Sequence, residues 1–160
     1  MAETECIRGR LEAKGRRFAV VSARFNQRIV DLLTAGAVDC LQRHGADAGA
    51  ITRVQVPGAW ELPAALEELA AAAGHDGLVA LGVVIRGETA HFDYICAECS
   101  RGIARVSAKY RIPIGFGVLT CEDSAQAMER AGGKSGNKGW EAAQAAIEMA
   151  DLFARLREAQ

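Results

Sequence analysis

The longest apolar run of the chain ends in LVALGVVI, Leu78–Ile85. These residues do not alternate between apolar and polar side chains, as they would in a strand with one face in water. Continuous apolar strands are typical of parallel sheets in which helices cover both faces. We therefore expect Leu78–Ile85 to be a central strand of a parallel sheet.

Three further segments have the composition of strands, and each is followed by a helical pattern. The expected strands are FAVVSA (18–23), ITRVQV (51–56), LVALGVVI (78–85) and IPIGFGVL (112–119). The first expected helix begins after Asn26. The other four lie at about 60–73, at about 92–109, within 122–131 and at 140–156. Strands that alternate with helices over short links form a parallel sheet with right-handed crossovers. The sequence predicts an α/β fold: a three-layer αβα sandwich with a four-stranded parallel sheet and helices on both faces.

Several residues mark the expected helix ends. Asn26 is a favourable N-cap for the first helix, and Gly45 and Gly74 stand where the first two helices should end. The segment GGKSGNKG (132–139) should break the chain before the last helix and present Lys134 and Lys138.

Length and charge restrict the class of protein. The 160 residues suffice for one domain, and a net charge of −1 gives no basic surface for nucleic acid or an anionic membrane. The N-terminal residues MAETECIRGRLEAKGRRF lack the apolar segment of a secretion signal. We expect a cytoplasmic protein with a single domain over 16–160. Residues 1–15 fit no helix and are a candidate segment for pairing with a neighbouring subunit.

The cysteines do not indicate a cofactor site. Their number, five, is odd, which argues against a disulfide framework. Cys96 and Cys99 form a C-x-x-C, a spacing found in redox and metal sites. The pair lies inside an expected helix without a second cysteine pair, so we expect helix packing and no metal.

Unusual residues follow the expected strands. Phe25 comes after the first, Trp60 after the second and His91 after the third. Ligands of open parallel sheets bind beyond the carboxyl ends of the strands. Exposed aromatic side chains there are costly unless something covers them. Either aromatic residue alone could cap the core, but both at one end favour a planar ligand.

The segment Gly87-Glu88-Thr89 precedes an expected helix start, where backbone N–H groups and the helix dipole can bind an anion. Glu88 is unfavourable in such a site and should point away. GGKS (132–135) resembles the end of a P-loop, but it follows a helix and has Met128 in place of the first glycine. We therefore reject a P-loop and keep Gly87–Thr89 as the candidate anion site.

Five motifs together resemble the lumazine synthase family of riboflavin biosynthesis. They are RFN, VPGAWELP, ALGVVIRGETAHFDY, GFGVLT and ERAGGKSGNKGWEAA, in the family's order and spacing from about residue 16 onward. The resemblance implies a flavodoxin-like topology. It also implies the condensation of 5-amino-6-(D-ribitylamino)uracil with 3,4-dihydroxy-2-butanone 4-phosphate to 6,7-dimethyl-8-ribityllumazine, with loss of phosphate and water and without a cofactor.

The resemblance also assigns roles to residues. His91 is the implied proton-transfer catalyst, and the phosphate is held by Gly87, Glu88 and Thr89 with Arg130 of the adjacent subunit. The implied substrate-binding residues are Phe25, stacked on the pyrimidine, Ala59, Trp60 and Glu61 at the ribityl chain, Val83, Val84, Ile85 and Phe116 in the pocket wall, and Lys138 near the uracil.

Family resemblance extends to assembly. Members form homopentamers with active sites between subunits, and some pentamers pack into icosahedral shells. The short GGKSGNKG loop resembles that of shell-forming members, although it could serve the pentamer alone. Riboflavin synthase is a candidate partner.

Other classes of protein use the same scaffold. A non-catalytic flavin- or lumazine-binding protein, or a structural shell protein, would not need His91, Arg130 and Lys138 together. A flavodoxin-like redox protein would need a Ser/Thr/Gly-rich phosphate loop after the first strand, where this chain has Arg24-Phe25-Asn26.

Overall fold

The computed structural model describes residues 4–159. Four parallel strands form one sheet in the order β2-β1-β3-β4. They are β1 (Phe18–Ala23), β2 (Ile51–Val56), β3 (Gly77–Ile85) and β4 (Ile114–Cys121). All four expected strands are present, and the fourth is shifted two residues along the chain, so that it reaches Cys121.

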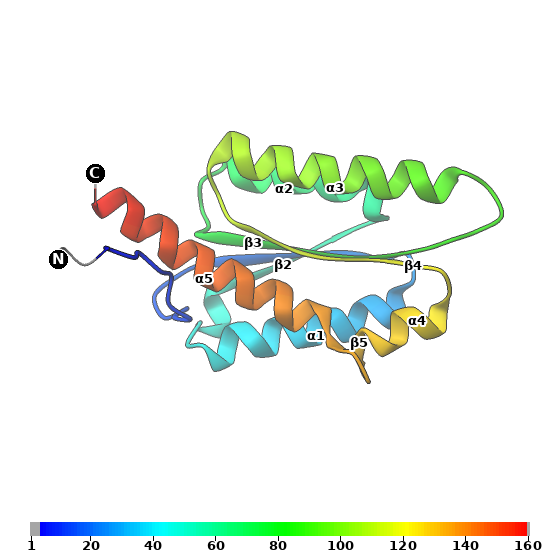
Figure 1. The fold of residues 1–160 in the computed structure, drawn as a ribbon, viewed down its shortest axis with the longest axis horizontal. Coiled ribbons are helices and arrows are strands. Elements are labelled where there is room, and N and C mark those ends of the chain that lie inside the picture. Colours follow the sequence, from blue (N-terminus) through cyan, green and yellow to red (C-terminus); the bar gives the residue numbers. More distant parts are fainter. Residues whose placement is uncertain (1–3, 160) are drawn as a thin grey trace.

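Helices cover both faces of the sheet, as Figure 1 shows. The α-helices are α1 (Gln27–Arg43), α2 (Leu62–Ala71), α3 (His91–Tyr110), α4 (Ser124–Glu129) and α5 (Lys138–Glu158), and short 3-10 turns are η1 (Ala48–Ala50) and η2 (Ala59–Glu61). Helices α2 and α3 lie on one side, and α1, α4 and α5 on the other. The predicted three-layer αβα sandwich is confirmed. None of the helices within residues 4–159 is long and apolar enough to cross a membrane.

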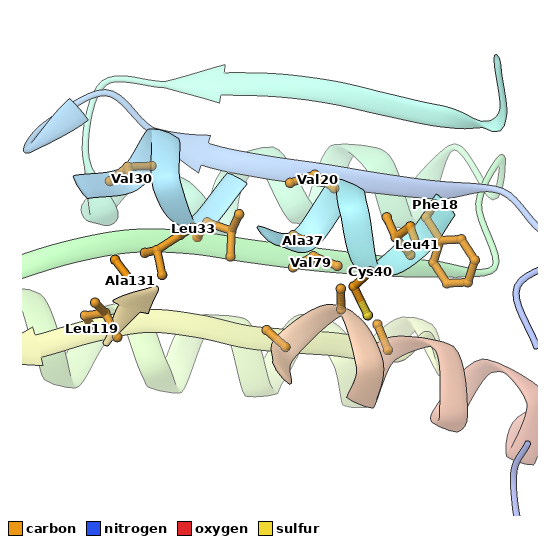
Figure 2. Close-up of a cluster of buried hydrophobic side chains, with 14 of the residues drawn as sticks. Phe18, Val20, Val30, Leu33, Ala37, Cys40, Leu41, Val79, Leu119 and Ala131 are labelled. Carbon is orange, nitrogen blue, oxygen red and sulfur yellow. The ribbon is translucent and has the colours of Figure 1, made fainter. Parts of the chain in front are cut away.

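The two inner strands carry the core. All of β1 is buried, and so are the first seven residues of β3. Figure 2 shows the cluster between the sheet and the helices α1 and α5, which contains Phe18, Leu33 and Val79. A second cluster lies under α2 and α3 and contains Leu62, Leu66 and Ile103. Burial on both faces explains why the β3 sequence is continuously apolar.

Two helix ends differ from the sequence prediction. Asn26 has a left-handed backbone (φ 59°), and its side chain does not cap α1. Past α2, the left-handed residue is Ala73 (φ 52°) and not Gly74. Gly45 does have the positive φ, 103°, that favours glycine after a helix.

The segment 132–139 does more than break a helix. Strands β5 (Ala131–Gly133) and β6 (Gly136–Asn137) form an antiparallel hairpin ahead of α5. The Asn137 side chain then caps α5 by accepting hydrogen bonds from the N–H groups of Gly139 (2.9 Å) and Trp140 (3.1 Å).

The N-terminal segment has no helix or strand over residues 4–17 and is tied to α5 by Asp151. This carboxylate is 6% exposed and accepts hydrogen bonds from the Arg10 N–H (2.7 Å) and the Arg16 guanidinium (2.8 Å). Burial alone would raise the pKa of Asp151, but the bonds from Arg155, Arg16 and Arg10 lower it below its ordinary value. This part of the segment therefore packs on its own chain. Pairing of residues 1–15 with a neighbour stays a prediction, and residues 1–3 lie outside the described range.

Close packing of α5 on α1 gives a test of the fold. A Cβ at Gly139 would lie 2.0 Å from the backbone oxygen of Leu33. We expect Gly139→Ala to lower the free energy of unfolding by about 1–3 kcal/mol, measured by urea denaturation. At Gly49 an added Cβ meets nothing within 4 Å, so Gly49→Ala should change the free energy of unfolding by less than about 0.5 kcal/mol. Equal stabilities of the two variants would contradict the packing.

Candidate active site

The loops after β1, β2 and β3 enclose a cleft of about 390 Å³. It lies at the carboxyl ends of the strands, at the end of the sheet opposite the chain termini in Figure 1. The lining residues are Phe25, Gly58, Ala59, Trp60, Val83, Val84, Ile85, Gly87, Thr89, His91, Phe92 and Ile95. Most of the site residues predicted from the sequence therefore line this one cleft within a single chain.

The loop after β1 is fixed by hydrogen bonds to the end of β2, to the loop that follows β2, and to β3. The Arg24 N–H donates to Val56 O (2.8 Å), and the Phe25 N–H donates to Pro57 O (3.1 Å). The Asn26 side chain donates to Val83 O on β3 (2.9 Å). Asn26 does stand at the predicted N-cap position of α1, but its side-chain amide bonds across the sheet end to β3 and not to α1. These bonds hold Phe25, which is 72% exposed, at the edge of the cleft.

The turn η2 supplies the second aromatic side chain. Ala59 is buried, and Trp60 is 56% exposed. The Glu61 carboxylate accepts a hydrogen bond from the Gly58 N–H (2.9 Å), which closes the turn. Glu61 is not among the lining residues, unlike its two predecessors. Its carboxylate shapes the turn that presents Trp60.

His91 begins α3 on the far side of the cleft. Its N–H donates to the Thr89 hydroxyl oxygen (3.4 Å), and its ring shares the cleft with Ile95, one helical turn later. The 20-residue helix directs its free N–H groups and positive dipole end toward the preceding turn, where an anion is stabilised. Glu88 is exposed and does not line the cleft. An apolar slot therefore adjoins the N-terminus of a long helix.

Three predicted site residues lie elsewhere in the chain. Phe116 lines a groove of about 790 Å³ between α3, β4 and α5, together with Phe153 and Leu156. Arg130 follows α4 and donates to Gln126 O (2.9 Å). Lys138 begins α5, where its ammonium pairs with Glu141 (2.7 Å). None of the three is among the residues that line the cleft of this chain.

The two cationic residues among these three, Arg130 and Lys138, are joined across the hairpin. The Lys138 N–H donates to Arg130 O (2.8 Å), so the β5–β6 hairpin holds the two residues at its base. The backbones of Arg130 and Lys138 are thus adjacent, and neither residue lines the cleft of Phe25 and Trp60.

Sequence reasoning missed some residues near the cleft. Phe92 and Ile95 line it from α3, and Gly58 lines it from the turn before η2. The spacing of Ile95, four residues after His91, puts both on one helix face and could have identified it. Arg86 was also missed, although it directly follows the central strand.

The C-x-x-C pair lies within α3, as predicted. Cys99 is buried, and burial raises the pKa of its thiol to about 11. Desolvation by burial also raises the pKa of the half-buried Cys96. Within residues 4–159, no cluster of three or more His, Cys, Asp or Glu side chains is arranged to hold a metal ion.

Known proteins of similar sequence identify the family. The sequence profile of the family 6,7-dimethyl-8-ribityllumazine synthase matches residues 15–154. The chain belongs to the lumazine synthase family. The resemblance drawn from the five sequence motifs is confirmed.

Individual lumazine synthases match nearly end to end. A relative from Aquifex aeolicus is 55% identical over 149 residues, which cover 93% of this chain and 97% of the relative. One from Desulfovibrio desulfuricans is 51% identical over 156 residues, covering 98% and 100%. One from Chlorobaculum tepidum is 50% identical over 154 residues, covering 96% and 99%. All three are named 6,7-dimethyl-8-ribityllumazine synthase.

Asn26 offers a test of how the chain fixes its first loop. Asn26→Ala removes the hydrogen bond to Val83 O and places alanine at φ 59°. Asn26→Gly removes the same bond but tolerates that backbone. We expect a loss of about 2 kcal/mol for alanine and about 1 kcal/mol for glycine in urea denaturation. A glycine variant as unstable as the alanine variant would show that the left-handed backbone carries no cost.

Proposed function

We propose that this chain condenses 5-amino-6-(D-ribitylamino)uracil with 3,4-dihydroxy-2-butanone 4-phosphate in the cleft beyond β3. Membership of the lumazine synthase family supports the reaction, which is the penultimate step of riboflavin biosynthesis. One observation carries the location. The exposed rings of Phe25 and Trp60 border the same cleft as the N-terminus of α3. A planar substrate and a phosphate-bearing substrate are matched by these two features.

The aromatic side of the cleft is the proposed pyrimidine site. Phe25 stacks on the ring, and Val83, Val84 and Ile85 form an apolar wall at the strand end. Ala59 and Trp60 border the ribityl chain. Glu61 accepts from a ribityl hydroxyl with the carboxylate that also holds the Gly58 N–H.

His91 is the proposed proton-transfer residue. The amine of the uracil attacks the ketone and forms an imine with loss of water. Phosphate then leaves by elimination, and ring closure releases further water. Each step moves a proton, and an imidazole can both accept and donate protons near neutral pH. Holding the two reactive substrates together supplies much of the remaining acceleration.

The phosphate is proposed to bind at the turn before α3. The backbone N–H groups of Gly87, Glu88 and Thr89 and the Thr89 hydroxyl surround the anion, while the helix dipole favours its charge. The guanidinium of Arg130 from an adjacent copy stabilises the departing phosphate. The family resemblance implies that Arg130 comes from a neighbour, and its place outside the cleft of its own chain supports this assignment.

We extend the same proposal to assembly. A homopentamer would let Phe116, Arg130 and Lys138 of one copy complete the cleft of the next. The short β5–β6 hairpin favours further packing of pentamers into an icosahedral shell. Light scattering checks this step, since particles of pentamer size would contradict the shell. Pairing of residues 1–15 with a neighbour, association with riboflavin synthase and a cytoplasmic location complete the proposal.

The proposed reaction is tested by mixing the purified protein with both substrates. Lumazine absorbance and fluorescence should rise, and inorganic phosphate should appear in equal amount. Formation of lumazine at the uncatalysed rate would contradict the enzyme and favour a non-catalytic lumazine-binding protein.

His91→Ala should impair turnover without abolishing it. The substrates react slowly unaided, so we expect a fall in kcat of about 10²-fold. His75 lies at the opposite end of the sheet, just before β3, and His75→Gln should keep the wild-type kcat. Complete loss of activity in a folded and assembled His91→Ala protein would contradict this role.

A site shared between copies predicts complementation. Arg130→Ala should weaken use of the butanone phosphate far more than of the uracil. When Arg130→Ala and His91→Ala chains are co-assembled in equal amounts, about a quarter of the sites combine an intact His91 with an intact Arg130. Activity should then rise above that of either variant. No rise would contradict an active site that spans two copies.

A further inference from the structure

Arg86 connects the elements around the Gly87–Thr89 turn, the proposed phosphate site. Its backbone N–H donates to Cys121 O of β4 (2.9 Å). Its guanidinium Nε donates to both Glu122 oxygens (3.0 and 3.2 Å), and Nη1 donates to Asp93 in the first turn of α3 (3.4 Å). Its Cζ lies 4.3 Å from the centre of the Phe92 ring. One side chain thus joins the end of β3, the end of β4 and the start of α3.

The segment that Arg86 spans has little other support. Residues 87–91 are all exposed, so the hydrophobic core does not fix them. The first residue of α3 to be buried is Phe92, on which the guanidinium lies. A guanidinium is planar and presents its donors in a rigid fork, so simultaneous bonds to two carboxylates and a ring contact determine its orientation. The same contacts therefore set the distance between the strand end and His91.

We propose that Arg86 is a positioning residue that holds the Gly87–Thr89 turn and His91 in their working arrangement. The inference rests on the proposed function, because the proposed function assigns phosphate binding to that turn and proton transfer to His91. Arg86 does not line the cleft, so it acts through Phe92, Asp93 and Glu122 and not on the substrate. The Asp93 and Glu122 side chains are 60% and 64% exposed, and ion pairs of such exposure contribute little to global stability. Its loss should therefore disturb the loop much more than the fold.

A second chain of contacts runs from Arg86 toward Arg130. The Glu122 N–H donates to the Gln126 side-chain oxygen (2.9 Å), and Gln126 O accepts from the Arg130 guanidinium (2.9 Å). Arg86 is thereby linked to the start of α3 in its own cleft and to the Arg130 that, in the proposed assembly, serves the cleft of a neighbouring copy.

The kinetic test compares Arg86→Gln with Arg101→Gln. Arg101 pairs with Glu98 (3.0 Å) on the same helix, is 70% exposed, and lies far along α3 from the turn. Arg86→Gln should raise the KM for butanone phosphate and lower kcat, with a combined loss in kcat/KM of about tenfold or more. The KM for ribitylaminouracil and the Tm should match those of Arg101→Gln. Arg86→Lys should not restore activity, since a lysine cannot bond two carboxylates in a fixed plane.

Amide hydrogen exchange gives a readout that does not depend on activity. Exchange over residues 87–92 should be faster in Arg86→Gln and unchanged in Arg101→Gln. Wild-type kinetics in Arg86→Gln, full rescue by lysine, or an equal rise of both KM values with a fall in Tm would each overturn the proposal. A wild-type protein without lumazine-forming activity would refute the proposed function instead, whatever the exchange data show.

Discussion

Burial of β3 on both faces is the constraint on which the rest of the structure depends. A strand whose first seven residues are buried must be covered by helices on either side of the sheet. Parallel neighbours then require crossover connections, and these leave the sheet at the carboxyl ends of the strands. The loops after β1, β2 and β3 consequently gather at one end, where a ligand can be enclosed without opening the core.

Hydrogen bonds between these loops give the cleft its shape. The loop after β1 bonds to the loop after β2 through Arg24 and Phe25, and to β3 through the Asn26 amide. The turn that presents Trp60 is closed by Glu61 on Gly58. These bonds hold two exposed aromatic side chains in place, which is the preorganisation that the proposed binding of a planar substrate requires. The turn before α3, the proposed phosphate site, is supported differently, by the contacts of Arg86 with Glu122, Asp93 and Phe92.

Much of this arrangement could be predicted from the sequence, because strong periodic and apolar patterns are local. All four strands, the three layers and the position of His91 at a helix start followed from such patterns. The N-cap position of Asn26 was predicted, but the bond of its side chain to Val83 was not, because Val83 is distant in the sequence. The strands of the β5–β6 hairpin are too short to show a periodic pattern in the sequence. Phe116, Arg130 and Lys138 were grouped with the site by resemblance, which also assigned Arg130 to the adjacent subunit; the patterns within one chain do not tell which copy supplies a residue. Arg86 was assigned no role because charged residues after strands are ordinary, and its partners lie at the start of α3 and just after β4.

The central claim is that the cleft beyond β3 is where the lumazine forms. A crystal structure of the protein with 6,7-dimethyl-8-ribityllumazine tests it most directly. The account predicts density for the heterocycle stacked on Phe25, with the ribityl chain beside Ala59 and Trp60 and the ring system within reach of His91. A fully occupied lumazine bound in the groove of Phe116, Phe153 and Leu156, with the cleft beyond β3 empty, would contradict it.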